Sequence, residues 1–323
     1  MKKRAINLCF LLFVFIISSC ATNIPYQIDN IDSDKFTPVL FVPGLDIGNN
    51  LPCLDMSRDK WPELYELFEE HGYDLKVACI PPNGRISALA KVLYYEIKLL
   101  FDNPKGNKKY KDKKFHIIAK SMGGLVTREM LAKYDWLDNG QHHLSDRVLS
   151  VTTISTPHFG SLIADNLMEE ESCLSGNDSL DKDSLIRLQE SGCDLRVSNM
   201  NNFNKTYPDK HNIPFFSFGY KIRCDSVFCK VHDWISPFYP VNFVAQCWHD
   251  RIFDTTNTEN DGLVSEKSAK WGVYLGTFEG EHFAETAKPW DGIFSLFSLY
   301  KGKWIWRDVF ERVIINLNRQ SHI

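Results

Sequence analysis

Several features that would define a class of function are scarce or missing in this sequence of 323 residues. Its one marked apolar run, Ala5–Ile17, is too short to cross a bilayer as a helix and is interrupted by Asn7. Basic residues are not in excess, and the net charge of −4 gives no reason to expect nucleic acid as a partner. Repeats and low-complexity tracts are also lacking. With 44% apolar residues, the chain is able to bury a large core.

Cysteine is present, but not in the spacing of a zinc site. Cys224 and Cys229 have four residues between them and lack partner histidines in the pattern of a zinc site. Seven cysteines follow residue 20, namely Cys53, Cys79, Cys173, Cys193, Cys224, Cys229 and Cys247. In an exported protein they would allow up to three disulfides and leave one thiol over. Connectivity cannot be read from the sequence, and Cys53–Cys79 and Cys173–Cys193 are the pairs that we consider first.

Residues 1–19 have the composition of a signal peptide, because three basic residues (Lys2–Arg4) precede the apolar run. The run leads into Ser18-Ser19-Cys20, which resembles the lipobox of bacterial lipoproteins, where the cysteine is lipidated. An ordinary signal peptide that contains a cysteine is the alternative. We expect export to a bacterial cell envelope, the outer membrane in particular, with Cys20 as the lipid attachment site. Residues 20–36 would then lead to a folded domain of residues 37–323.

Short apolar segments alternate with amphipathic segments along this domain. Strands are expected at 38–42, 75–80, 115–119, 148–155, 214–219 and 272–278. Helices are expected at 61–70, 87–101 and 305–317, and a further helix follows the turn at 120–124 and ends at residue 134. Such alternation predicts the α/β class, with a mostly parallel central sheet covered by helices on both faces. Residues 162–210, rich in Ser, Asp, Asn and Glu, are expected to form helical insertions.

Ser121 occupies a tight turn between an expected strand and an expected helix. A nucleophilic serine needs such a turn at the carboxyl end of a strand, with small residues two positions before and after it. Here Ala119 and Gly123 hold those positions, and alanine replaces the usual first glycine. The following helix would direct its N-terminal amides toward developing negative charge. Ser121 is therefore the candidate nucleophile.

A base and an acid must follow the serine if the chain uses the order Ser, Asp or Glu, then His. His282 lies in a turn after an expected strand, and Asp261 lies upstream in an Asn-Asp-Gly turn that could equally be an ordinary turn. The acid would orient the imidazole and stabilise its protonated form. The backbone N–H groups of Met122 and Leu45 are the candidate oxyanion donors, although the loop at 43–45 could be a plain strand terminator.

Four segments together resemble the bacterial triacylglycerol lipases of the α/β-hydrolase superfamily. They are FVPGL (41–45), AKSMGGL (119–125), STPHFGS (155–161) and NDGLVSEKSAKWG (260–272) with EHF (281–283). The resemblance implies an α/β-hydrolase fold and a lipase or esterase that cleaves carboxylic esters of lipids. It implies the same roles for the five candidate residues, and it implies a mobile helical lid at about 162–210 over an apolar acyl pocket.

The sequence departs from that family at three positions. Pro43 and Lys120 stand where the family has histidine; neither position supplies essential chemistry, although Lys120 changes the local charge. Ala284 stands where many members have a calcium-binding aspartate, so we expect no metal site there and no cofactor. His158, within STPHFGS, is interpreted as a packing or hydrogen-bonding residue.

Other functions remain compatible with the same three residues. A phospholipase A, a lipid acyltransferase or a thioesterase would use the same triad on another bond. A catalytically inactive, surface-anchored binding protein is a further alternative, and the intact Ser, Asp and His argue against it. The sequence leaves the natural substrate, the acyl chain length and the oligomeric state open.

Overall fold

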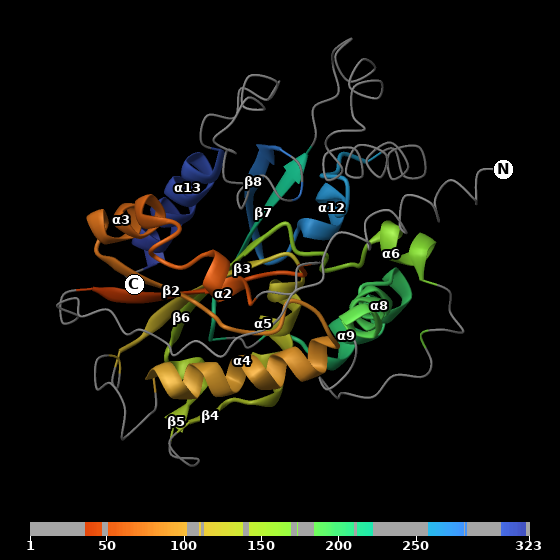
Figure 1. Ribbon diagram of the computed structural model, residues 1–323, viewed down its shortest axis with the longest axis horizontal. Helices are drawn as coiled ribbons and strands as arrows, with labels where there is room; N and C mark the ends of the chain where they lie inside the picture. The colour runs from red at the N-terminus through yellow and green to blue at the C-terminus, as the bar shows by residue number, and fades with distance from the viewer. Residues whose placement is uncertain are drawn as a thin grey trace, which may run out of the picture.

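A computed structural model describes residues 36–46, 51–101, 110, 113–137, 142–168, 173, 184–209, 212–221, 258–280, 282 and 305–320. Its central sheet has six parallel strands in the order β2-β1-β3-β6-β7-β8 (Figure 1). The strands are β1 (Thr37–Val42), β2 (Tyr73–Val77), β3 (Phe115–Lys120), β6 (Val148–Ile154), β7 (Phe215–Lys221) and β8 (Val273–Glu279). Two-residue strands β4 (Trp136–Leu137) and β5 (His142–His143) form a separate antiparallel pair. The predicted parallel sheet is thus confirmed.

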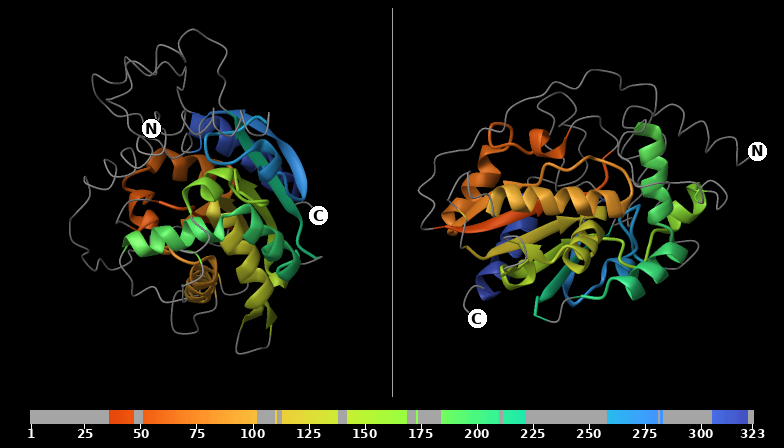
Figure 2. Two further views of the ribbon diagram at one scale, coloured as in Figure 1. Left: turned by 90° about the vertical axis from the view of Figure 1, so that its right-hand side faces the viewer. Right: turned by 90° about the horizontal axis from the view of Figure 1, so that it is seen from below.

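Helices cover both faces of this sheet (Figure 2). On one face, α4 (Ile86–Phe101) and α5 (Met122–Lys133) share a buried core with Leu40 and Val42 of β1. On the other, α3 (Pro62–Glu70) and α13 (Ile305–Gln320) share a core with Val39 and Phe41. Successive residues of β1 therefore enter opposite cores, which explains why this strand is an unbroken apolar run.

Shorter helices lie between these main elements. They are α2 (Pro52–Asp55), a 3₁₀ turn at Leu144–Asp146, α6 (Leu162–Leu167), α8 (Ser184–Asp194), α9 (Val197–Thr206) and α12 (Glu266–Ala269). The segment 162–210, predicted to be helical, contains α6, α8 and α9, which lie together at one end of the molecule (Figure 2). Disulfides join Cys53 to Cys79 and Cys173 to Cys193, as considered from the sequence.

Some sequence-based predictions concern residues outside the described ranges. These include the expected signal peptide, Cys20, Ala284 and the cysteines at 224, 229 and 247. Within the described ranges, no helix combines the length and the apolar content needed to cross a bilayer.

Candidate active site

The turn at Ser121 joins β3 directly to α5. Ser121 has φ 50° and ψ −132°, a conformation that side-chain-bearing residues rarely adopt. Its backbone N–H donates to the carbonyl of Ile154 (2.9 Å), which ties the turn to the neighbouring strand β6. A Cβ on Gly123 would lie 2.4 Å from the carbonyl oxygen of Pro43, and one on Gly124 2.3 Å from Oγ1 of Thr156. Glycine at both positions therefore lets the start of α5 pack against the ends of the strands.

Ser121, His282 and Asp261 are brought together by the fold, and all three are buried. Nε2 of His282 lies 2.8 Å from Oγ of Ser121, and Nδ1 of His282 lies 2.7 Å from Oδ2 of Asp261. Because an ionised carboxylate can only accept hydrogen bonds, Nδ1 carries the proton and donates to Asp261. Nε2 is then the acceptor for the Ser121 hydroxyl, which is the arrangement that a general base requires.

Asp261 is held in one orientation by donors on both carboxylate oxygens. The backbone N–H groups of Leu263 (3.0 Å) and Val264 (2.7 Å) donate to Oδ1, and the Ser155 hydroxyl donates to Oδ2. Burial raises the pKa of Asp261, but the electrostatic interaction with His282 and the hydrogen bonds lower it by more, so the pKa lies below its ordinary value. The carboxylate is therefore ionised and fixed beside the imidazole.

The loop after β1 runs against the nucleophile. Gly44 adjoins Ser121 with no room for a side chain, and the next residue, Leu45, is half-buried against the core below α4 and α5. Met122 follows Ser121 as the first residue of α5 and is buried. Of the two residues expected to supply oxyanion donors, Met122 thus follows the serine in the chain and Leu45 follows the glycine that adjoins the serine. Their role in binding an oxyanion stays a prediction.

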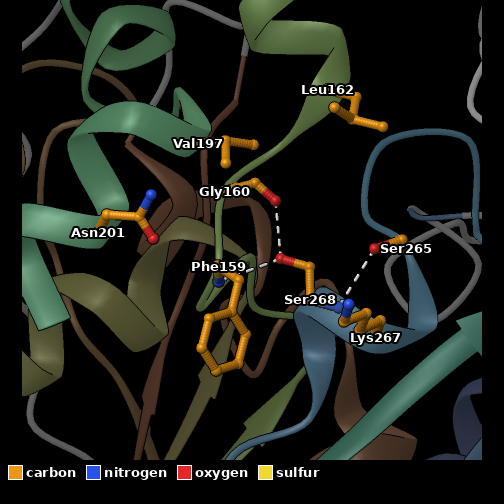
Figure 3. A pocket seen from close by; sticks show the side chains of 8 residues that line it. All are labelled: Phe159, Gly160, Leu162, Val197, Asn201, Ser265, Lys267 and Ser268. Carbon is orange, nitrogen blue, oxygen red and sulfur yellow. Dashed lines mark hydrogen bonds between the residues drawn. The ribbon is translucent and has the colours of Figure 1, made fainter. Parts of the chain in front are cut away.

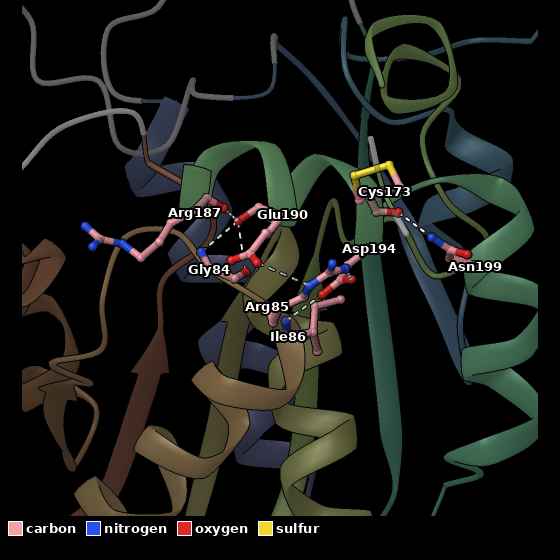
Figure 4. A network of polar contacts seen from close by, with 10 residues as sticks. Gly84, Arg85, Ile86, Cys173, Arg187, Glu190, Asp194 and Asn199 are labelled. Atoms are coloured by element: carbon pink, nitrogen blue, oxygen red, sulfur yellow. Dashed lines mark hydrogen bonds and ion pairs between the residues drawn. A yellow bond between two sulfur atoms is a disulfide. The ribbon is translucent and has the colours of Figure 1, made fainter. Parts of the chain in front are cut away.

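A polar network fastens α8 to the neighbouring loop (Figure 4). Asp194 accepts from Nη1 of Arg85 (2.6 Å) and from the backbone N–H of Ile86 (2.8 Å). Ser191 accepts from the backbone N–H of Gly84 (2.8 Å). A disulfide joins Cys193, on the same helix, to Cys173. These contacts hold α8 against the N-terminal end of α4. Because α4 packs in the core, α8 is attached to the core through it.

The same network reaches the loop that carries Leu45. Nε of Arg187, on α8, donates to Oδ1 of Asn83 (3.0 Å). Asn83 donates in turn to the carbonyl of Asp46 (3.4 Å), whose N–H donates to the carbonyl of Pro82 (2.8 Å). The residue after Leu45 is therefore hydrogen-bonded to a loop that α8 holds in place.

His158 is a packing residue, as predicted from the sequence. Its ring stacks on Trp271 with centroids 5.0 Å apart, and its Nε2 lies 3.1 Å from Oγ1 of Thr153. Burial and the adjacent Arg128 cation lower the pKa of His158 well below its ordinary value, so the ring is neutral. Arg128 itself stacks on Trp271, with its guanidinium carbon 3.7 Å from the ring centroid. Lys120 and Pro43, where the resemblance expects histidine, are both buried.

A cavity of about 310 Å³ opens beside the STPHFGS segment (Figure 3). Its described lining consists of Phe159, Gly160, Leu162, Val197, Asn201, Ser265, Lys267 and Ser268. Ser268 fixes two of its walls, because its hydroxyl donates to the carbonyl of Gly160 (2.7 Å) and accepts from the N–H of Phe159 (3.1 Å). None of the described lining residues belongs to the Ser-His-Asp cluster. In the described part of the chain, no group of three or more His, Cys, Asp or Glu side chains is placed to hold a metal ion.

One residue of this site was not identified from the sequence. Ser155 was noted as the end of the strand expected at 148–155 and as the first residue of the STPHFGS segment, without a role in the site, yet its hydroxyl donates to the candidate acid. The available signal was its position, because Ser155 directly follows β6 at the same edge of the sheet where Ser121 follows β3. Polar residues at the carboxyl ends of parallel strands commonly form binding and catalytic sites.

The chain is similar to known proteins in sequence and in structure. A yeast protein, Triacylglycerol lipase 2 of Saccharomyces cerevisiae, is 28% identical over 227 residues, or 69% of this chain. The match spans 60% of the length of that relative. Staphylococcus hyicus lipase superposes with a TM-score of 0.53 at 16% identity, covering 91% of this chain and 100% of that one. Bacillus licheniformis lipase BlEst2 in its mature form gives 0.52 at 20% identity, covering 80% and 89%.

These structural likenesses show that the fold is that of the α/β-hydrolases, as expected from the sequence. The family model described as "Putative serine esterase (DUF676)" matches residues 84–246, about half of the chain. The matched residues include Ser121 and its flanking strand and helix, whereas Asp261 and His282 lie beyond them. The extent of this match establishes that the chain belongs to this family of serine esterases.

Proposed function

We propose that this protein hydrolyses carboxylic esters of lipids through a covalent acyl-enzyme. The observation that carries the proposal is the continuous hydrogen-bonded chain from Ser121 through His282 to Asp261, mounted on a turn of strained backbone. Such a chain has one well-known chemical use, which is to activate a hydroxyl for attack on a carbonyl. Membership of the serine esterase family supports the same reaction.

In the proposed mechanism, Nε2 of His282 takes the Ser121 proton while Oγ attacks the ester carbonyl. Backbone N–H groups of Met122 and Leu45 stabilise the oxyanion of the tetrahedral intermediate. The protonated His282, stabilised by the Asp261 carboxylate, then gives its proton to the leaving alcohol. A water molecule, deprotonated by His282, attacks the acyl-enzyme and releases the carboxylic acid.

Lipid esters are the proposed substrates because the yeast relative carries the name of a triacylglycerol lipase. A phospholipase A, a lipid acyltransferase or a thioesterase would use the same triad, and no contact in the described residues favours one of them.

The proposal is tested with purified protein on a panel of substrates beside a Ser121→Ala control. The panel contains a soluble short-chain ester, a triacylglycerol, a phospholipid and an acyl thioester. We expect the wild type to cleave the esters and to be labelled at Ser121 by a fluorophosphonate probe, and the control to do neither. Failure of folded wild type to be labelled or to cleave any member of the panel would overturn the proposal.

We also propose that the chain is exported and anchored to a membrane by a lipid on Cys20. The two disulfides support export, because such bonds persist in oxidising compartments and are rare in the cytosol. Mass spectrometry of the mature N-terminus should find an acylated Cys20, and Cys20→Ser should abolish partition into membranes. An unmodified N-terminus at another residue would refute the anchor without affecting the proposed reaction.

A further inference from the structure

Ser155 shares an unusual backbone conformation with the nucleophile. Among the described residues, Ser155 (φ 46°) and Ser121 (φ 50°) are the residues other than glycine that have a positive φ. Such conformations are unfavourable for residues with a side chain and cluster at functional sites, where the surroundings enforce them. Ser155 is completely buried, and its backbone N–H donates to the carbonyl of Phe218 (2.8 Å). The fold therefore holds this residue rigidly in a conformation that serine disfavours.

The enforced conformation aims the Ser155 hydroxyl at Asp261. It donates to Oδ2, the oxygen that also accepts from Nδ1 of His282 (2.7 Å). The other oxygen, Oδ1, accepts from the backbone N–H groups of Leu263 and Val264. Both carboxylate oxygens are thus held by two donors each, and Ser155 and His282 are the side chains among these four donors.

This arrangement gives the hydroxyl two effects on the acid. With donors on both oxygens, the carboxylate plane is fixed, so that Oδ2 stays aligned with the Nδ1–H of His282. The hydroxyl also stabilises the ionised form, which contributes to the lowered pKa of Asp261. Without it, the buried carboxylate would lose one of two donors on the oxygen that faces the base, and the imidazole would lose a fixed partner.

We infer that Ser155 is a positioning residue for the catalytic acid and extends the chain Ser121–His282–Asp261 by a fourth member. The inference rests on the proposed function, since it assigns Asp261 its role in the same site. The Ser155 hydroxyl donates to Asp261, whereas the Ser121 hydroxyl is hydrogen-bonded to His282. It acts through Asp261, so its effect falls on turnover and not on substrate binding.

Two substitutions distinguish the effect of the hydroxyl from the effect of the strained backbone. Ser155→Gly removes the hydroxyl and relieves the strained φ, because glycine adopts positive φ readily. Ser155→Ala removes the hydroxyl but keeps the strain. If the hydroxyl positions Asp261, both variants lose kcat by roughly 10- to 100-fold on a soluble ester, as a small displacement of a catalytic group does, with KM unchanged within about twofold. Ser155→Gly should remain folded, judged by its thermal midpoint.

The matched control is Ser150→Ala on β6, the strand that Ser155 directly follows. Ser150 is also completely buried, and its hydroxyl lies 2.8 Å from Nδ1 of His116, within the core. This variant should lose stability while keeping kcat. A spectroscopic readout accompanies the kinetics: the downfield proton resonance of His282 Nδ1–H, sensitive to the Asp261 contact, should move or broaden in Ser155→Gly and stay in place in Ser150→Ala.

The outcomes distinguish this inference from the function on which it rests. Wild-type kcat in Ser155→Gly, with an unchanged Nδ1 resonance, would refute the positioning role while leaving the esterase intact. Loss of activity in Ser155→Ala alone would also refute it, because the cause would then be backbone strain. Absence of esterase activity and of fluorophosphonate labelling in the wild type would instead refute the proposed function.

Discussion

A methyl group on Gly44 would lie 2.6 Å from Cβ of Ser121 and 2.9 Å from the carbonyl oxygen of Lys120. Real Cβ atoms essentially never approach other atoms more closely than 3.0 Å. The lack of a side chain at Gly44 therefore allows the loop after β1 to reach the nucleophile, and Leu45, one of the two proposed oxyanion donors, is the next residue of that loop.

Replacing Gly44 by alanine should reduce catalysis more than stability. The atoms that must move to make room belong to Ser121 and to the backbone before it, so we expect kcat to fall by at least about tenfold. Gly72→Ala is the control, because its φ of 82° predicts a stability cost while no atom lies within 4 Å of the added Cβ. Kinetics and thermal unfolding of both variants check this; full activity in Gly44→Ala would contradict the close approach.

Single substitutions in the proposed triad should be severe and poorly additive, because the three groups act as a unit. We expect Ser121→Ala and His282→Ala to reduce turnover by roughly 10⁴-fold or more. Asp261→Ala should cost less than either, since a misoriented imidazole retains some basicity. Asp254→Ala and Glu285→Ala serve as controls near the acid and the base in sequence. Should Asp254→Ala abolish activity while Asp261→Ala retains it, the acid has been assigned wrongly.

The sequence predicted the sheet and its main helices well because their signals are local. The helix expected at 87–101 is found at Ile86–Phe101, and the strand expected at 148–155 at Val148–Ile154. Strands buried on both faces are continuous apolar runs with turn residues at their ends, and amphipathic helices repeat every three to four residues. Strands β4 and β5 were not predicted, since two residues are too few to form a pattern.

The order and type of the candidate triad residues could also be read from the sequence, but their surroundings could not. Ser155 and Asp261 are 106 residues apart, and Arg85 and Asp194 are 109 residues apart. No local pattern reports contacts at such separations. The positive φ of Ser155 is equally invisible, because serine has no sequence signature for it. The lid expected at 162–210 contains the predicted helices, and its mobility stays a prediction.

The ion pair of α8 with the start of α4 should contribute measurably to stability. Asp194→Asn keeps the shape of the side chain but removes the charge that Arg85 contacts at 2.6 Å, and both side chains are largely buried. We expect the free energy of unfolding to fall by about 2 kcal/mol. Asp308→Asn breaks a pair with Arg312 that is more than half exposed and should cost less than about 0.5 kcal/mol. Equal losses of unfolding free energy in the two variants, measured by urea unfolding, would contradict this contribution of the Arg85–Asp194 ion pair.

Acid should destabilise the protein through His116. Burial lowers the pKa of this histidine from 6.5 to about 4 in the folded state. Below pH 6.5 the unfolded chain therefore binds a proton that the folded chain does not. The stabilising contribution is complete above pH 6.5 and is lost as the pH falls from there toward 4. Between pH 7.5 and 5 this amounts to about 2 kcal/mol.

Urea unfolding of the wild type and of His116→Asn at these two pH values measures the effect. The asparagine amide preserves a polar contact with Ser150 but does not titrate. We expect the variant to be less stable at pH 7.5 and to lose less stability on acidification. A pH dependence identical to that of the wild type would show that His116 does not carry this contribution.

The base that we propose lies 161 residues after the nucleophile in the chain. During synthesis, Ser121 and the strands that hold it are therefore made long before His282 exists. Until that histidine is in place the serine hydroxyl lacks the proposed acceptor for its proton, so we expect a nascent or truncated chain to be inactive. A hydrolase of lipid esters that is exported as we propose thus completes its catalytic apparatus only with β8, the last described strand of its sheet, and the turn that follows it.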